Sequence, residues 1–189
     1  MKVIDLTIPK GAIFSDDGKY RYVLWRSWKA NPIIRLQISL NPSSAGALND
    51  DPTITRSMTR ANQDGFGALI QENLSAFIST DPKIFLKEGC QIGAETNEYL
   101  KHAIVLTLMS GGQVVIAWGS FPGLTWRAAQ VLRMIPEPYC LGVNADGQPK
   151  HPLYVSYKTP VKRYLIDTAH AKVAQVPPRS EWERAEPVY

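Results

Sequence analysis

The sequence predicts an α/β domain of three α/β/α layers, with a central four-stranded parallel sheet and an added N-terminal β-hairpin. Short apolar runs alternate with segments of helical apolar spacing, and this alternation requires crossover connections and a parallel sheet. The 189 residues suffice for one well-buried core and are short for two. We therefore expect a single domain over residues 1–166. Residues 167–189, which are proline-rich and charged, are expected to form an extended or mobile C-terminal extension.

The first elements are a hairpin and the first strand of the parallel sheet. Residues 12–15 and 19–28 are expected to form antiparallel strands at a sheet edge, joined by the turn Asp16-Asp17-Gly18. The strand after them, over residues 32–40, is rich in β-branched residues. It stops at Asn41-Pro42, because proline has no N–H to give to the sheet and restrains the residue before it.

Helices and strands alternate over the remainder of the domain. Asp51 is expected to cap a helix that has Pro52 at its first position and ends near Gly65. By the same kinds of pattern, further strands are expected at residues 67–74, 113–118 and 139–143, and further helices at residues 80–89, 95–109 and 123–135.

Composition excludes several classes of protein. With 44% hydrophobic and 20% charged residues, the chain is not expected to be disordered as a whole. No apolar run approaches the roughly 20 residues that span a bilayer, and the first residues lack the apolar stretch of a signal peptide. We therefore expect a cytoplasmic protein without membrane contact. The net charge of +4 permits a phosphate-bearing partner but does not require one, because the basic residues are scattered.

No cofactor and no metal site is predicted. Cys90 and Cys140 form no CxxC pair, and the three histidines do not have the spacing of zinc ligands. The chain also contains no phosphate loop of the form GxxxxGK[ST], no dinucleotide-binding GxGxxG and no GxSxG nucleophile elbow. Any chemistry is therefore expected to come from ordinary side chains gathered by the fold.

Polar side chains follow each of the four predicted parallel strands. Ligands of open parallel sheets bind at the carboxyl ends of the strands. The segments expected at that rim are Asn41-Pro42-Ser43-Ser44, Asn73, Trp118-Gly119-Ser120 and, after a turn, Lys150-His151-Pro152-Leu153. Any one of them alone is more typical of an ordinary turn, and only their convergence on one rim indicates a site.

Several of these segments resemble an uncharacterised domain-of-unknown-function family found in bacteria and phages. The resemblance covers about residues 12 to 157. It is carried by the runs 20–28 (YRYVLWRSW), 40–43 (LNPS), 49–53 (NDDPT), 117–119 (AWG) and 151–153 (HPL). The combination is specific, but this family implies no activity.

A more distant resemblance is to the uracil-DNA glycosylase superfamily, which has a four-stranded parallel sheet flanked by helices. Asn41-Pro42 is similar to its first motif in the asparagine version, as in the mismatch-specific glycosylases. Asn73 is placed like the asparagine that reads the base edge, and His151-Pro152 is similar to the start of the last motif. The Ser-Pro loop by which the family grips DNA is replaced here by Leu153-Tyr154-Val155.

This resemblance implies an N-glycosylase-like hydrolase that recognises a nucleobase in DNA or in a modified nucleoside or nucleotide. His151 and Asn41 would be catalytic: neutral His151 would donate a hydrogen bond to the departing base, and Asn41 would orient a water molecule. Asn73 would pair with the base edge, and Phe66 would stack on the base. The remaining substrate-binding residues would be Pro42, Ser43, Ser44, Trp118, Gly119 and Leu153.

Two other functions stay open from the sequence. One is a non-catalytic module that binds a nucleotide or nucleic acid in the same pocket, because an amide at position 41 cannot take a proton from water. The other is a phage-type interaction protein that binds through the aromatic hairpin and the C-terminal extension. The sequence does not indicate an oligomeric state.

Overall fold

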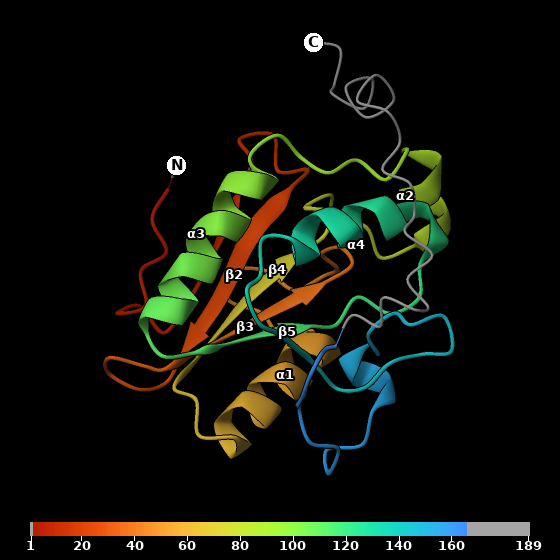
Figure 1. Cartoon of the computed structure of the whole chain (residues 1–189). Helices are drawn as coiled ribbons and strands as arrows, with labels where there is room; N and C mark the ends of the chain where they lie inside the picture. The colour runs from red at the N-terminus through yellow and green to blue at the C-terminus, as the bar shows by residue number, and fades with distance from the viewer. Residues whose placement is uncertain (1, 166–189) are drawn as a thin grey trace.

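A computed structural model describes residues 2–165 of the chain (Figure 1). Its centre is one mixed seven-stranded sheet with the strand order β1-β2-β4-β3-β5-β6-β7. The strands are β1 (Lys10–Phe14), β2 (Arg21–Ser27), β3 (Ile34–Ser39), β4 (Ala68–Asn73), β5 (Gln113–Ile116), β6 (Pro138–Cys140) and β7 (Lys162–Arg163). The predicted α/β class is therefore confirmed, but the sheet is a mixed sheet of seven strands rather than a four-stranded parallel sheet with an added hairpin.

Antiparallel strands at both edges make the sheet mixed. In the middle, β3 pairs in parallel with β4 and with β5, and β5 pairs in parallel with β6. The hairpin strand β2 pairs antiparallel with β4, so the hairpin forms one edge, as its sequence predicted. The two-residue strand β7 closes the other edge against β6, and no sequence pattern indicated it.

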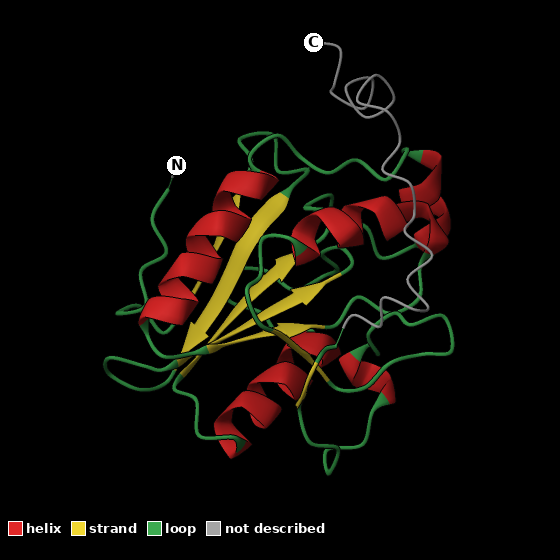
Figure 2. Cartoon of the chain, in the orientation of Figure 1, coloured by secondary structure: helices red, strands yellow, loops and turns green. Residues whose placement is uncertain are grey.

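Helices cover both faces of the sheet. They are α1 (Pro52–Gln63), α2 (Pro82–Lys87), α3 (Thr96–Met109) and α4 (Thr125–Leu132). Figure 2 shows α3 and α4 on one side of the sheet and α1 on the other. The Asp51 side chain caps α1 by accepting a hydrogen bond from the N–H of Ile54, and Pro52 follows it, as expected from the sequence. The last helix is shorter than predicted at both ends, because residues 122–124 form a separate 3-10 turn and α4 ends at Leu132.

The two faces of the sheet differ in polarity. The face under α3 and α4 carries the main apolar core, to which β3 contributes Leu36 and Ile38. Because side chains alternate along a strand, Arg35, Gln37 and Ser39 of β3 point to the other face, toward α1. All three are buried, and this polar face forms the base of the site described below.

The aromatic residues of the hairpin are used in packing. Tyr22 and Trp25 are buried in the main core, and the half-buried Trp28 packs on a smaller cluster under α1. The indole N–H groups of Trp25 and Trp28 donate to the carbonyls of Ile8 and Phe66. The hairpin therefore does not display these rings as a binding surface.

No helix within residues 2–165 is long and apolar enough to cross a membrane. The predicted C-terminal extension over residues 167–189 lies outside the described residues.

Candidate functional site

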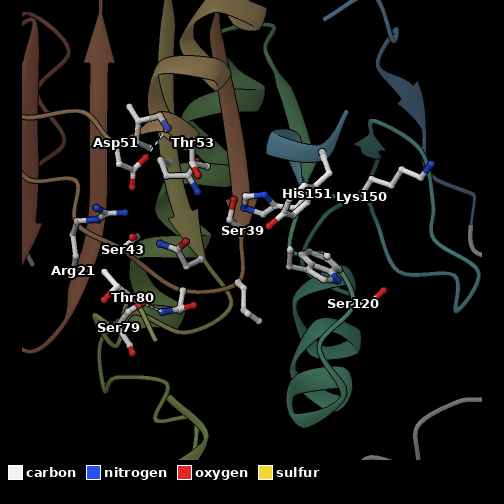
Figure 3. A pocket seen from close by; sticks show the side chains of 18 of the residues that line it. Arg21, Ser39, Ser43, Asp51, Thr53, Ser79, Thr80, Ser120, Lys150 and His151 are labelled. Atoms are coloured by element: carbon white, nitrogen blue, oxygen red, sulfur yellow. Dashed lines mark hydrogen bonds between the residues drawn. The ribbon is translucent and has the colours of Figure 1, made fainter. Parts of the chain in front are cut away.

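A cavity of about 650 Å³ opens at the carboxyl ends of β3, β4 and β5, beside the start of α1. Its lining comes from the ends of these strands, the start of β2, the loop between β3 and α1 with the first turn of α1, the loop after β4, and the segments around Asn144 and His151 (Figure 3). This is the rim at which the sequence placed its polar residues, and ligands of open parallel sheets bind there.

The floor of the cavity is made of buried polar side chains from β3 and β4. Gln37 donates to Gln71 at 2.9 Å, and Gln71 in turn donates to the carbonyl of Glu72. Asn73 lies two residues beyond Gln71 on the same face and is only 3% exposed. Within residues 2–165 its side chain makes no hydrogen bond, and its Nδ2 is buried without a partner. A buried amide in that state costs about 1–3 kcal/mol unless something else pairs with it.

Asn41 holds two loops together at the edge of the cavity. Its Nδ2 donates to the carbonyl of Ser79 at 2.8 Å and to that of Pro42 at 3.1 Å. The N–H of Ser79 donates back to the carbonyl of Pro42. These bonds fix the orientation of the amide and leave its Oδ1 free to accept a hydrogen bond from a ligand or a water molecule.

His151 enters the cavity from the segment that follows β6. Its Nδ1 accepts a long hydrogen bond, 3.4 Å, from the N–H of Leu153, which assigns the ring proton of the neutral form to Nε2. Desolvation by burial lowers the pKa of His151, and nearby Asp51 opposes that shift. The imidazole is therefore neutral at pH 7 and presents an N–H donor. Gly119 has a φ of +75° and lies close to the Cβ of His151.

Two arginines of α1 fasten the His151 segment to the helix. Arg56 donates to the carbonyls of Pro152 and Val155, and Arg60 donates to those of Val155, Ser156 and Thr159. Both guanidinium groups also lie over the ring of Tyr157. Because α1 carries Asp51 at its first turn, these contacts fix Asp51 and His151 relative to each other.

A cation and a carboxylate complete the cavity. Arg21 is 2% exposed, and one of its Nη atoms donates to the carbonyl of Ala45. Burial lowers the pKa of Arg21 to about 10, and Asp51 opposes this, so the guanidinium stays charged at pH 7. Asp51 caps α1 through Oδ1, and its Oδ2 makes no hydrogen bond within residues 2–165. The charge of Asp51 thus acts on both Arg21 and His151.

The structure gathers most of the side chains that the sequence placed at the rim. The residues predicted at the rim that line the cavity are Asn41, Ser43, Asn73, Trp118, Gly119, Ser120, Lys150 and His151. Pro42, Ser44 and Leu153 lie beside these residues in the chain but are not part of its lining. The Trp118 indole N–H is already bonded to Gln148 at 2.8 Å, so Trp118 offers its ring face rather than a donor.

Phe66 is not in the cavity, and its predicted position is corrected. It precedes β4 and therefore lies at the amino end of the parallel strands, away from the cavity. There its ring packs against the guanidinium of Arg35, whose carbon is 4.1 Å from the ring centre.

Several lining residues were not predicted from the sequence. They are Arg21, Ser39, Leu40, Asp51, Thr53, Ile54, Gln71, Ser79, Thr80, Asn144 and Tyr154. A signal existed for two of them, because Ser39 and Gln71 continue polar alternation in strands that are otherwise apolar. Asp51 was recognised only as a helix cap.

No group of three or more His, Cys, Asp or Glu side chains in the described part of the chain is arranged to hold a metal ion. Comparison with family models gives a match over residues 21–153 to a family described as "Protein of unknown function (DUF1643)". That range includes the strands β2 to β6, α1, the cavity floor and His151. No curated protein and no solved structure matches the chain.

Proposed function

The chain belongs to this family of proteins of unknown function, and from its cavity we propose that it recognises a nucleobase and hydrolyses the N-glycosidic bond to it. The substrate is a base carried by DNA or by a modified nucleoside or nucleotide. The observation that carries the proposal is the unpaired amide of Asn73 on the cavity floor.

Asn73 suits the edge of a base because an amide presents a donor and an acceptor side by side. Asparagine pairs with base edges in this bidentate way, and each such pair contributes about 1–3 kcal/mol of discrimination between bases. The protein leaves both ends of the Asn73 amide without a partner within residues 2–165, while the neighbouring amides of Gln37 and Gln71 are bonded. A bound base would satisfy the Asn73 amide, which the fold leaves unpaired within residues 2–165.

The groups around Asn73 suit bond cleavage. Water would attack the anomeric carbon, and the electrons of the breaking C–N bond would leave on the base. His151 Nε2–H would donate a hydrogen bond to the base as negative charge develops on it. Asn41 Oδ1 would orient the water, and Asp51 Oδ2 would accept its proton. Asp51 supplies the base that an amide at position 41 lacks.

The architecture also supports the proposal. Four mutually parallel strands, β4-β3-β5-β6, have helices on both faces and a cavity at their carboxyl ends. This arrangement agrees with the resemblance of Asn41-Pro42 and His151-Pro152 to motifs of the uracil-DNA glycosylase superfamily. We therefore propose a uracil-DNA glycosylase-like core extended by antiparallel strands.

The test is release of free base, measured by chromatography. The panel holds single- and double-stranded DNA with uracil or other modified bases, and the corresponding nucleosides and nucleotides. We expect release from at least one substrate, and its loss in His151→Ala and Asn41→Ala. Asp51→Asn keeps a capping side chain on α1 but removes the proton acceptor, so release should fall while folding is preserved.

Matched controls separate chemistry from general damage. His102→Ala removes a half-buried histidine of α3, and Asn62→Ala removes an exposed asparagine of α1; neither lines the cavity. Both should release base at the wild-type rate. The proposed function is wrong if no substrate of the panel binds or loses its base.

A second function, binding without turnover, is favoured by one observation. The amide nitrogen of Asn41 is fully used in holding the loops of Pro42 and Ser79, so Asn41 has a structural role regardless of water. Tight binding of a panel member to the wild type, with no release of base from it under any condition, would establish this function in place of hydrolysis.

A further inference from the structure

The guanidinium of Arg21 is a buried cation without an ion pair in the described part of the chain. One Nη atom is bonded to the carbonyl of Ala45, but Nε is buried without a partner, and the second Nη makes no hydrogen bond within residues 2–165. These two nitrogens form one edge of the guanidinium fork, which binds two oxygens of a phosphate or carboxylate at once. Asp51 acts on this charge only from beyond ion-pair distance.

The neighbouring Arg26, on the same strand, is a buried arginine whose guanidinium does have an ion pair and hydrogen-bond partners. Arg26 is also on β2 and nearly fully buried, but it pairs with Asp50 at 2.6 Å and donates to the carbonyls of Gly46 and Asn49. It does not line the cavity, whereas Arg21 does. The fold therefore supplies hydrogen-bond and ion-pair partners for Arg26, which lies outside the cavity, but leaves one edge of the Arg21 guanidinium, which lines the cavity, without partners within residues 2–165.

Arg21 and His151 lie on opposite sides of the cavity. Figure 3 shows Arg21 with Ser43 and Thr80 on one side and His151 on the other. The strand order agrees, because β2 with Arg21 lies beyond β4, whereas Gly119, next to His151, follows β5 on the far side of β3. Asn73 ends β4 between them. A ligand that reaches both sides needs an anionic group well separated from its base.

We propose that the cavity binds a free mononucleotide, with its terminal phosphate on the open fork of Arg21 and its base between Asn73 and His151. This inference rests on the proposed function and names its substrate class. The hydroxyl groups of Ser43 and Thr80 line the same side of the cavity and supply further donors for phosphate oxygens.

Burial of Arg21 favours a free nucleotide over a position within a nucleic acid strand. With Arg21 only 2% exposed, the phosphate must enter the cavity to reach the guanidinium. A terminal phosphate can enter together with its sugar and base. A phosphodiester within a strand carries further nucleotides on both sides, and these would have to enter as well. The basic residues are scattered along the sequence rather than clustered, which agrees with a small ligand rather than a duplex.

The experiment compares ligands that differ only in phosphate. Binding of each nucleoside of the panel, of its 5′-monophosphate and of inorganic phosphate is measured by calorimetry on the full chain. We expect the monophosphate to bind about 10- to 100-fold more tightly than the nucleoside, as for charge-assisted hydrogen bonds in a buried site. Inorganic phosphate should compete with the monophosphate.

Three variants locate the effect. Arg21→Gln should remove the gain from phosphate, measured as the ratio of the affinities of the same variant for the monophosphate and for the nucleoside. Arg21→Lys, which retains the charge without the fork, should keep only part of the gain. Arg26→Gln is the matched control, because it disturbs the same strand and loop without touching the cavity, and it should keep the full gain. Thermal unfolding of each variant identifies any that fail to fold.

The outcomes distinguish this inference from the proposed function. Nucleoside binding without any gain from phosphate, or a gain that survives in Arg21→Gln, would overturn the phosphate site and leave base recognition standing. Arg21-dependent binding of inorganic phosphate without binding of any nucleoside or nucleotide would overturn base recognition. Absence of binding by every ligand would overturn both.

Discussion

Asn73→Leu is expected to make the free protein more stable while abolishing its affinity for ligand. The two side chains have similar shapes, and position 73 is only 3% exposed, so leucine fits without meeting water. The substitution removes a buried amide that has no hydrogen bond within residues 2–165, which relieves about 1–3 kcal/mol of the free energy lost to an unpaired polar group. For a chain of this size the melting temperature should rise by about 2–12 °C.

The assay is urea unfolding and thermal melting of Asn73→Leu beside a control at Gln71. Gln71 lies two residues earlier on the same face, but its amide is bonded to Gln37 and to the carbonyl of Glu72. Gln71→Met should therefore lower the free energy of unfolding by about 1–3 kcal/mol, opposite in sign to Asn73→Leu. Equal destabilisation by both variants would refute the reasoning, because Asn73 would then be a structural residue rather than one left open for a ligand.

Three further predictions concern the side chains of Glu72, His151 and Arg60. Burial raises the pKa of Glu72 well above 4.5, so the folded protein loses stability as the pH rises from about 4.5. Glu72→Gln should therefore be more stable than the wild type at pH 7, and the difference should be smaller at pH 4.5. Urea unfolding at the two pH values measures this difference. Burial lowers the pKa of His151, so the stability of the wild-type protein should fall as the pH drops below 6.5 toward the lowered pKa. His151→Asn should lose this part of the pH dependence. A variant with the same pH dependence of stability as the wild type would contradict the burial of His151. Arg60→Met should speed hydrogen exchange over residues 151–159 and weaken ligand binding, although Arg60 does not line the cavity. Unchanged exchange would show that the hydrogen bonds of Arg60 do not hold the His151 segment in place.

Local signals explain which elements the sequence predicted well. Asp51-Pro52 and Asp81-Pro82 each place a capping carboxylate before a proline, and both helices begin there because those interactions lie within one turn. The strand β7 has no such signal. It consists of two residues that pair with β6, and its Arg163 forms an ion pair with Glu137; both interactions join distant parts of the chain.

The site was predictable to the extent that it follows the rule of parallel strands. Asn41, Asn73 and His151 meet because each follows a strand of the parallel core, and that rule needs only the strand assignment. The same rule, applied to Phe66, places it at the opposite end, because it precedes its strand. The unpaired state of Arg21 was not predictable from the sequence. It arises because Asp50 and the carbonyl of Gly46 bind Arg26 rather than Arg21, and these are contacts between distant parts of the chain.

The state of the Asn73 amide tests the central claim most directly. In a titration followed by ¹H–¹⁵N NMR, with the Asn73 side-chain signal assigned by its absence in Asn73→Leu, a nucleoside or nucleotide of the panel should shift that amide signal at saturating concentration. The shift reports a hydrogen bond that the free protein lacks within residues 2–165. The claim that this cavity binds a base would be contradicted if no ligand of the panel shifted the Asn73 signal. It would also be contradicted if every ligand that shifted the Asn73 signal shifted the signals of the bonded amides of Gln37 and Gln71 equally.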